Sequence, residues 1–244
     1  MNDPLFDRTD VLVLQHLNED GPGYLGQWLD EQGLRWQVLC AEAGEVYPAS
    51  VKGFQGLAVL GGAWSANDDR PTLRQAEALI READALGIPV LGHCLGGQLM
   101  ARAFGGRVQT LEQPEIGWLP IRHNSSDAAR VWLGEQTDAT VYQWHHDSFV
   151  ELPPGAELIA SSPACAHQAF VLRQHLAMQF HIEITPQKIG DWMAHPGDTY
   201  PALVQRHLDS VQGPQAIADG TTRYQSGSEA LAWRIYETWR SRWR

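Results

Sequence analysis

Residues 89–98 have the composition of a turn that carries a nucleophile. The segment reads Pro-Val-Leu-Gly-His-Cys-Leu-Gly-Gly-Gln, so Cys94 follows a short apolar stretch and has a glycine two positions away on either side. A strand that turns sharply into a helix strains the backbone at the nucleophile, and neighbouring Cβ atoms would clash there. The start of the helix also favours the thiolate, the reactive form of cysteine. The pattern predicts a catalytic Cys94 rather than a buried structural thiol.

A second segment, Met-Gln-Phe-His-Ile-Glu at residues 178–183, supplies a base and a carboxylate. Alternate residues of an extended chain point to the same side, so Glu183 can reach the imidazole of His181. The carboxylate would fix the ring tautomer, and the histidine would stabilise the thiolate and protonate a leaving amine. A lone histidine at a strand end is more often a surface or capping residue. Its combination with the cysteine turn favours a triad of Cys94, His181 and Glu183.

The elements that position these residues follow from the hydrophobic pattern. In the first half, short apolar runs alternate with apolar residues at helical spacing, an order that predicts a parallel sheet covered by helices on both faces. In the second half, strand candidates follow one another with few helices between them, which predicts antiparallel additions to the sheet. The expected strands are 11–14, 36–40, 57–60, 89–91, 116–121, 131–133, 140–143, 158–161, 169–172 and 176–180.

The remaining expected elements are helices. Three of them cover residues 24–32, 73–86 and 95–104, and the tail returns to helices from about residue 186. The last expected strand could rejoin the core of the sheet. The sequence contains no internal repeat and no clear linker, so we expect one domain over residues 1–244.

Composition and charge limit the classes of function. The chain has 244 residues and a formal net charge of −11, which disfavours binding to nucleic acid. No stretch approaches the roughly 18 apolar residues of a membrane span, and the polar first ten residues do not resemble a signal peptide. We therefore expect a cytoplasmic protein that does not bind membranes. The three cysteines are widely spaced, and we expect Cys40 and Cys165 to be structural thiols.

The reactive segments together resemble the class I, triad-type glutamine amidotransferases. Cys94 stands in the family's Gly-x-Cys-x-Gly-x-Gln motif. His181 and Glu183 stand in its His-Pro-Glu motif, with Ile182 in place of the proline. A third segment, Gly-Gly-Ala-Trp-Ser at residues 61–65, is similar to the family's Gly-Gly-Pro-x-Ser, with alanine in place of the proline.

A fourth segment, Trp-His-His-Asp at residues 144–147, is similar to a Ser-His-x-Asp segment in the amidotransferase part of GMP synthetases, with Trp144 in place of the serine. The expected fold is α/β, a flavodoxin-like open sheet. It has a mostly parallel core, helices on both faces and antiparallel additions in the second half. The order of the elements extends the resemblance over most of the chain.

The resemblance implies roles for further residues. The backbone N–H groups of Gly62 and Leu95 would form an oxyanion hole, in which one donor is worth about 3 kcal/mol. Gln98 would contact the glutamine side of the substrate. Three adjacent polar residues at 145–147 rarely converge on one ion, so we predict neither a metal nor a cofactor. The other residues expected to bind substrate are Gly61, Trp64, His145, His146 and Asp147.

The implied reaction is cleavage of the γ-amide of glutamine through a cysteine thioester, which yields glutamate and ammonia. One alternative is a free-standing γ-glutamyl peptidase acting on γ-glutamyl peptides or amines. Another is a non-catalytic binding protein, although such a protein would be expected to lack a triad member. The sequence contains neither a phosphate-binding loop nor an ammonia-consuming domain. We expect either a separate synthetase subunit as ammonia acceptor or an enzyme that works alone, with Trp64 and Trp144 at the pocket mouth.

Overall fold

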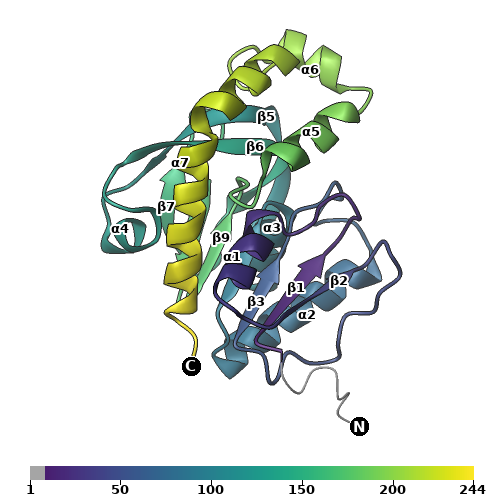
Figure 1. Cartoon of the computed structure of the whole chain (residues 1–244), viewed down its shortest axis with the longest axis vertical. Helices are drawn as coiled ribbons and strands as arrows, with labels where there is room; N and C mark the ends of the chain where they lie inside the picture. Colours follow the sequence, from purple (N-terminus) through teal and green to yellow (C-terminus); the bar gives the residue numbers. More distant parts are fainter. Residues whose placement is uncertain (1–8) are drawn as a thin grey trace.

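A single mixed sheet of nine strands forms the centre of the computed structural model, which describes residues 9–244. Residues 1–8 lie outside the described residues. The prediction that the first ten residues are not a signal peptide therefore falls mostly outside the described part of the chain. The strand order is β2-β1-β3-β4-β9-β8-β7-β5-β6 (Figure 1). The first five strands in this order are parallel, and they are β2 (Trp36–Cys40), β1 (Val11–Gln15), β3 (Gly56–Val59), β4 (Val90–His93) and β9 (His175–Met178).

The other four strands extend the sheet in antiparallel fashion beyond β9. The last expected strand does rejoin the core, because β9 pairs with β4 in parallel and with β8 in antiparallel orientation. The predicted mostly parallel core with antiparallel additions is thus confirmed. These added strands are β8 (Ala169–Leu172), β7 (Glu157–Ser161), β5 (Arg107–His123) and β6 (Asp138–Glu151).

Helices cover both faces of the sheet, because its parallel strands are apolar on both sides. Val11 and Val13 of β1 pack in one hydrophobic cluster, and Leu12 and Leu14 pack in another on the opposite face. The first cluster is covered by α1 (Tyr24–Glu31), α4 (Asp127–Leu133) and α7 (Pro214–Arg240), and the second by α2 (Pro71–Leu86) and α3 (Leu95–Ala103).

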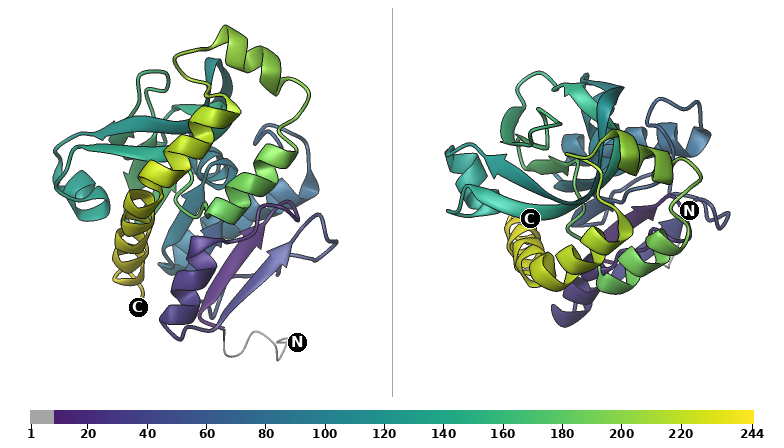
Figure 2. Two further views of the ribbon diagram at one scale, coloured as in Figure 1. Left: turned by 45° about the horizontal axis from the view of Figure 1, so that its top comes forward. Right: turned by 90° about the horizontal axis from the view of Figure 1, so that it is seen from above.

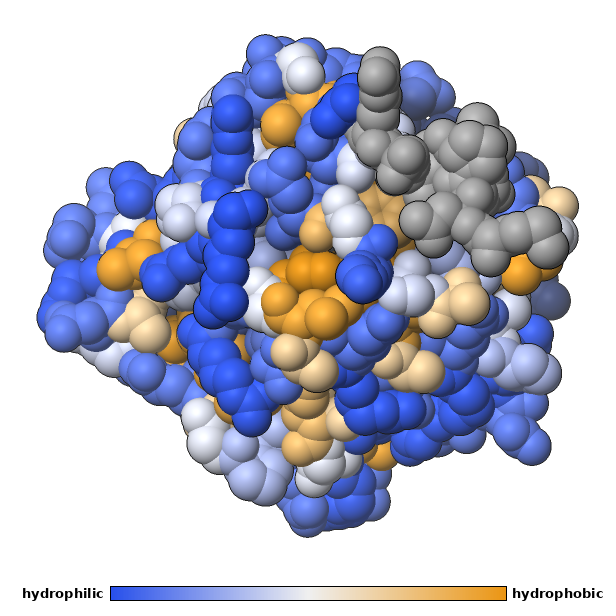
Figure 3. Space-filling model, turned by 90° about the horizontal axis from the view of Figure 1, so that it is seen from below, coloured by the Kyte–Doolittle hydropathy of each residue, from blue (hydrophilic) through white to orange (hydrophobic). Residues whose placement is uncertain are grey.

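Two short helices lie beside the start of α7, in the upper part of Figure 1, and they face the viewer in the view from above in the right panel of Figure 2. They are α5 (Pro186–Ala194) and α6 (Tyr200–Arg206), and a third hydrophobic cluster packs them against β5, β6 and α7. The opposite end, seen from below in Figure 3, is mostly hydrophilic with small hydrophobic patches. No helix within residues 9–244 is long and apolar enough to cross a membrane.

The predicted strand at residues 131–133 is wrong, because these residues form the last turn of helix α4. Ser126 caps that helix, with its hydroxyl accepting a hydrogen bond from the backbone N–H of Ala129. A carboxylate in the first turn, Asp127, also suits the positive end of the helix. Three consecutive apolar residues fit a strand or a buried helix turn equally well. The capping hydrogen bond of Ser126 stabilises the helix in this case.

Candidate active site

Cys94 lies at the turn between β4 and α3 with a backbone that L-residues rarely adopt. Its φ is 47° and its ψ is −108°, and its N–H donates to the carbonyl oxygen of Met178 at 2.9 Å. Such a conformation costs about 1–3 kcal/mol and is kept only where the surroundings enforce it. The flanking glycines allow this packing, because a Cβ on Gly96 would lie 2.0 Å from the carbonyl oxygen of Val59. The strained turn expected from the glycine pattern is present.

His181 and Glu183 face each other beyond the end of β9. Nδ1 of His181 lies 2.7 Å from Oε1 of Glu183, and both side chains are buried. The backbone N–H of His181 donates to the carbonyl oxygen of Tyr142 in β6 at 2.9 Å, so the chain stays extended after β9 has ended. This bridge keeps residues 181 and 183 on one side, as their spacing of two predicted.

Lys188 is a further charged group at this pair that sequence reasoning missed. Its ammonium lies 3.4 Å from Oε1 of Glu183 and donates to the carbonyl oxygen of Gly21 at 2.9 Å. Burial acts against the charge of Glu183, but His181 and Lys188 outweigh it and hold the pKa of that carboxyl well below its ordinary value. Glu183 is therefore ionised at neutral pH.

The imidazole of His181 is held in its charged form. Burial lowers the pKa of His181, but the negative charges of Glu183 and Cys94 outweigh burial and raise it to about 10. Nε2 of His181 has no hydrogen-bond partner among the described residues, and the ring lines a cavity together with Cys94. Gly61 stands close to both, since a Cβ there would lie 2.9 Å from Cε1 of His181 and 3.6 Å from Cβ of Cys94.

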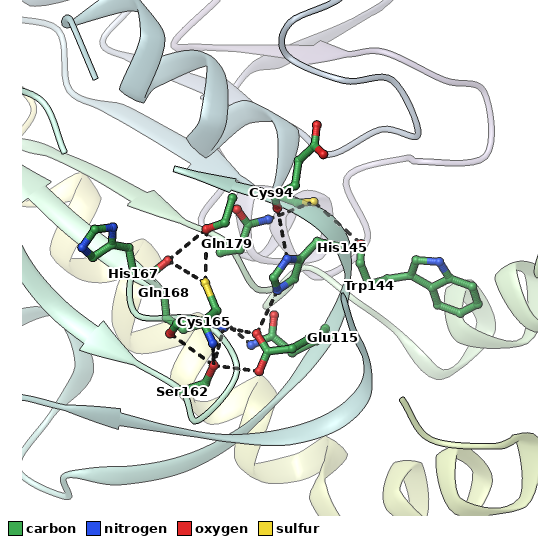
Figure 4. Close-up of polar contacts among 12 residues, drawn as sticks. Cys94, Glu115, Trp144, His145, Ser162, Cys165, His167, Gln168 and Gln179 are labelled. Carbon is green, nitrogen blue, oxygen red and sulfur yellow. Dashed lines mark hydrogen bonds and ion pairs between the residues drawn. The ribbon is translucent and has the colours of Figure 1, made fainter. Parts of the chain in front are cut away.

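Gln179 contacts the sulfur of Cys94 and was not expected to. Its Nε2 donates to Sγ of Cys94 at 3.6 Å (Figure 4). Its Oε1 accepts a hydrogen bond from Nε2 of Gln98 at 3.2 Å. Because Gln98 occupies the amide oxygen, the amide nitrogen of Gln179 is directed at the sulfur. The spacing 179, 181, 183 was the available signal, since it is the same alternation that linked His181 to Glu183.

One cavity, of about 330 Å³, gathers the residues expected to bind substrate with the exception of Gly61. Gln98 lines it, although its amide nitrogen is already bonded to Gln179 and to the carbonyl oxygen of Asp147. The carboxylate of Asp147 accepts from the hydroxyls of Ser65 and Thr110 at 2.6 and 2.7 Å. The cavity is lined by Gly62, Ala63, Trp64, Ser65, Cys94, Gln98, Trp144, His145, His146 and Asp147.

His145 is buried with both ring nitrogens engaged. Its Nε2 lies 3.1 Å from Oε2 of Glu115, and its Nδ1 lies 3.1 Å from the carbonyl oxygen of Asp147. Glu115 also accepts from Gln168 and Ser162 at 2.6 and 2.7 Å, as Figure 4 shows. This buried polar group holds the 144–147 segment, while the neighbouring His146 is exposed.

A second cavity, of about 280 Å³, also opens on Cys94. It shares Gly62, Ala63, Cys94 and Trp144 with the first cavity. Sequence reasoning placed none of its other residues in the site except His181. Those other residues are Leu17, Glu19, Asp20, His181, Trp192, His195, Pro196 and Gly197.

The two tryptophans expected at the pocket mouth take different places. Trp64 lines only the first cavity, and the guanidinium of Arg70 lies 4.3 Å from the centre of its ring. Trp144 lines both cavities and packs between Tyr200, on which it stacks, and Trp192, which it meets edge-on at 5.7 Å. Trp144 is thus held rigidly at the boundary of the two cavities.

Comparison with known proteins finds glutamine amidotransferases and GMP synthases among the relatives of this chain. The sequence model of the class-I glutamine amidotransferase family matches residues 29–195. The GMP synthase (glutamine-hydrolyzing) of Chromobacterium violaceum is 35% identical over 118 residues, which are 45% of this chain and 22% of that protein. The GMP synthase of Neisseria meningitidis serogroup B is 33% identical over 140 residues, which are 52% of this chain and 27% of that protein. The chain thus spans about a quarter of the length of these curated relatives.

Solved structures extend the similarity over nearly the whole chain. A glutamine amidotransferase from Methylobacillus flagellatus has a TM-score of 0.89 and 34% identity, covering 97% of this chain and 96% of that one. A glutamine amidotransferase from Thermotoga maritima has a TM-score of 0.82 at 24% identity, covering 96% and 98%, and supports the fold. The motifs around Cys94 and His181 predicted this relationship, and the chain belongs to the class-I glutamine amidotransferases, a family of enzymes.

Proposed function

We propose that the protein hydrolyses γ-glutamyl amides, with glutamine as the simplest substrate, to give glutamate and ammonia. The observation that carries the proposal is the unpartnered Nε2 of His181, which lines one cavity with Cys94 while Nδ1 is fixed by Glu183 at 2.7 Å. A nucleophile, a proton donor and an orienting carboxylate then stand in the order that acyl transfer requires.

In the first half of the reaction, the Cys94 thiolate attacks the γ-carbonyl carbon. A bond forms between sulfur and carbon, and the carbonyl oxygen becomes an oxyanion. The imidazolium of His181 gives its Nε2 proton to the leaving nitrogen, the carbon–nitrogen bond breaks, and ammonia departs. The raised pKa of His181 suits this role, because it keeps the ring protonated until the leaving group needs the proton.

In the second half, water attacks the γ-glutamyl thioester. His181 takes a proton from the water, the carbon–sulfur bond breaks, and glutamate leaves as the Cys94 thiolate is restored. The oxyanion of each step would accept hydrogen bonds from the backbone N–H groups of Gly62 and Leu95. Leu95 suits this role because it is the first residue of α3, where a backbone N–H has no acceptor within the helix. Each such donor is worth about 3 kcal/mol.

The direct test is glutamate release from glutamine by the purified protein and by matched variants. We expect Cys94→Ala and His181→Ala to abolish release. The control Cys165→Ala should retain it, because the thiol of Cys165 lines neither cavity and is hydrogen-bonded to Ser148. Retention of activity by Cys94→Ala would overturn the proposal. Loss of activity in the Cys165→Ala control would be traced to folding by its circular dichroism.

A second candidate is the hydrolysis of larger γ-glutamyl amides, such as γ-glutamyl peptides or amines. The second cavity favours it, because about 280 Å³ far exceeds the roughly 30 Å³ that a molecule the size of water or ammonia occupies. Comparing glutamine with γ-glutamyl dipeptides in the same assay decides between the two. For glutamine as the physiological substrate, we propose that a separate synthetase subunit receives the ammonia, since the matched GMP synthases are about four times longer than the matched segment.

A further inference from the structure

The second cavity opens on Cys94 beside the first. The first cavity holds the polar residues at 145–147 and Gln98, which suit the γ-glutamyl group. The two cavities share Cys94 and the loop at Gly62 and meet at Trp144. If the γ-glutamyl chain fills the first cavity, the group attached through the scissile amide must extend into the second. The lining of the second cavity then decides which leaving amines bind.

That lining combines carboxylates with aromatic rings. Asp20 is buried, with 7% of its surface exposed, and Glu19 lies beside it at the more open side. Trp144 and Trp192 contribute two indole rings, and the ammonium of Lys188 lies 5.1 Å from the centre of the Trp192 ring. None of the described residues that line the cavity is lysine or arginine, and the charged ring of His181 lines it beside Cys94. Carboxylates and indole faces are the groups that attract an organic cation.

The carboxylate of Asp20 has a side-chain hydrogen bond with Trp192 and feels the charges of Lys188 and His181, but among the described residues no lysine, arginine or histidine forms an ion pair with it. Lys188 already bonds Glu183 and the carbonyl oxygen of Gly21. Burial raises the pKa of Asp20 above its ordinary value, although Lys188 and His181 oppose that rise. A buried carboxylate in this condition gains from a cation brought in by a ligand, because pairing offsets the cost of its desolvation.

We propose that the second cavity is a subsite for a cationic leaving amine, and that the preferred substrates are γ-glutamyl amides of short aliphatic diamines. The distal ammonium would pair with Asp20 and Glu19 and lie against Trp144 and Trp192. The methylene chain would fill the space between them and Cys94. The inference rests on the proposed hydrolysis and adds no reactant to it, since water and the amide give glutamate and the free diamine.

The test compares three linear substrates of equal length that differ only at the distal end. These are γ-glutamyl-diaminobutane, γ-glutamyl-pentylamine and γ-glutamyl-aminopentanoate, which end in an ammonium, a methyl group and a carboxylate. We expect kcat/KM for the ammonium compound to exceed that for the methyl compound by about ten-fold or more, as a charged hydrogen bond implies. The carboxylate compound should be the poorest of the three.

The variant Asp20→Asn keeps the shape of the side chain and removes its charge. The readout is the ratio of kcat/KM between the ammonium and methyl compounds, because a general loss of activity or fold leaves that ratio unchanged. We expect Asp20→Asn to bring the ratio close to one. The control Asp127→Asn, which removes an exposed carboxylate on α4 far from the cavity, should keep the wild-type ratio.

The outcomes separate the inference from the function on which it rests. Hydrolysis of glutamine with equal rates for the three longer compounds would overturn the cationic subsite and leave the hydrolase proposal standing. A wild-type preference that Asp20→Asn does not change would overturn the role of Asp20. Failure to hydrolyse any of the four compounds would overturn the proposed function, and the subsite with it.

Discussion

The side-chain amide of Gln179 donates to the sulfur of Cys94 across 3.6 Å. Gln98 bonds the oxygen of the same amide at 3.2 Å and the carbonyl oxygen of Asp147 at 2.9 Å. The nucleophile, the start of α3 and the wall of the first cavity are thus joined by one chain of hydrogen bonds. In this chain Gln179 directs an amide N–H at the sulfur, and Gln98 fixes the orientation of that amide.

We predict that Gln179→Leu lowers kcat for glutamine hydrolysis by about ten-fold with little change in KM, because it removes a hydrogen bond to a charged sulfur. Gln179→Glu should lose more, since a carboxylate would then face the thiolate. Steady-state kinetics on both variants check this. A Gln179→Glu enzyme as active as wild type would contradict the role of the amide.

We predict that Lys188→Met shifts the acid limb of the activity profile to higher pH. Lys188 lowers the pKa of Glu183, so removing the ammonium raises that pKa, and Glu183 loses its charge at a higher pH as the solution is acidified. The pH dependence of kcat/KM measures the shift, and Lys188→Arg, which keeps the charge, should restore most of the wild-type profile. A general fall in activity with an unshifted profile would indicate a structural effect alone.

We predict that Gly61→Ala impairs catalysis far more than folding. The added Cβ would stand 2.9 Å from Cε1 of His181, so the imidazole must move away from its place beside Cys94. A displacement of this kind costs about 100-fold in rate. The control is Gly190→Ala in α5, where a Cβ would meet nothing within 4 Å. If Gly61→Ala retains full activity, the fit between His181 and Gly61 is not needed for catalysis.

We predict that the free energy of unfolding falls as the pH is lowered from 6.5 to 4, because of two buried histidines, His16 and His93. Burial lowers the pKa of His16 and that of His93 from 6.5 to about 4, with Glu183 partly opposing the shift at His93. In this window the unfolded chain takes up protons that the folded chain does not, so the free energy of unfolding falls as the pH falls. The loss is at most about 3 kcal/mol for each histidine.

Urea unfolding near neutral pH and near pH 5 measures this loss. His16→Gln, which cannot be protonated, should reduce the dependence of the unfolding free energy on pH. His195→Gln, at an exposed position, should leave it as in wild type. An unchanged slope in the His16→Gln variant would show that this histidine is not neutral in the folded protein.

The sequence predicted the parts of the site that depend on local spacing. The glycines around Cys94 predicted a strained turn, and the interval of two between His181 and Glu183 predicted their contact. The apolar runs predicted every parallel strand, and four of the five are buried along their whole length, which leaves a continuous apolar signal. The strand expected at residues 131–133 failed because three apolar residues carry no readable period.

Most of the residues that were missed reach the site through long-range folding. Asp20 comes from the loop after β1, far in sequence from Cys94 and His181, whereas Lys188 in α5 lies only five residues after Glu183. Glu115 supports His145 from the neighbouring strand β5. In the sequence alone, a single charged residue at any of these positions is typical of a solvent-exposed side chain. The contacts of these residues follow only from the register of β5 with β6 and from the position of α5.

The most direct test of the account is to find the covalent intermediate on Cys94. The protein is mixed with glutamine, quenched in acid within the first turnovers, and examined by intact and peptide mass spectrometry. We predict a γ-glutamyl thioester on the peptide that contains Cys94, none on the peptides of Cys40 and Cys165, and none on the Cys94→Ala protein. Release of glutamate from Cys94→Ala at the wild-type rate, with no adduct at any cysteine, would contradict a cysteine-nucleophile mechanism.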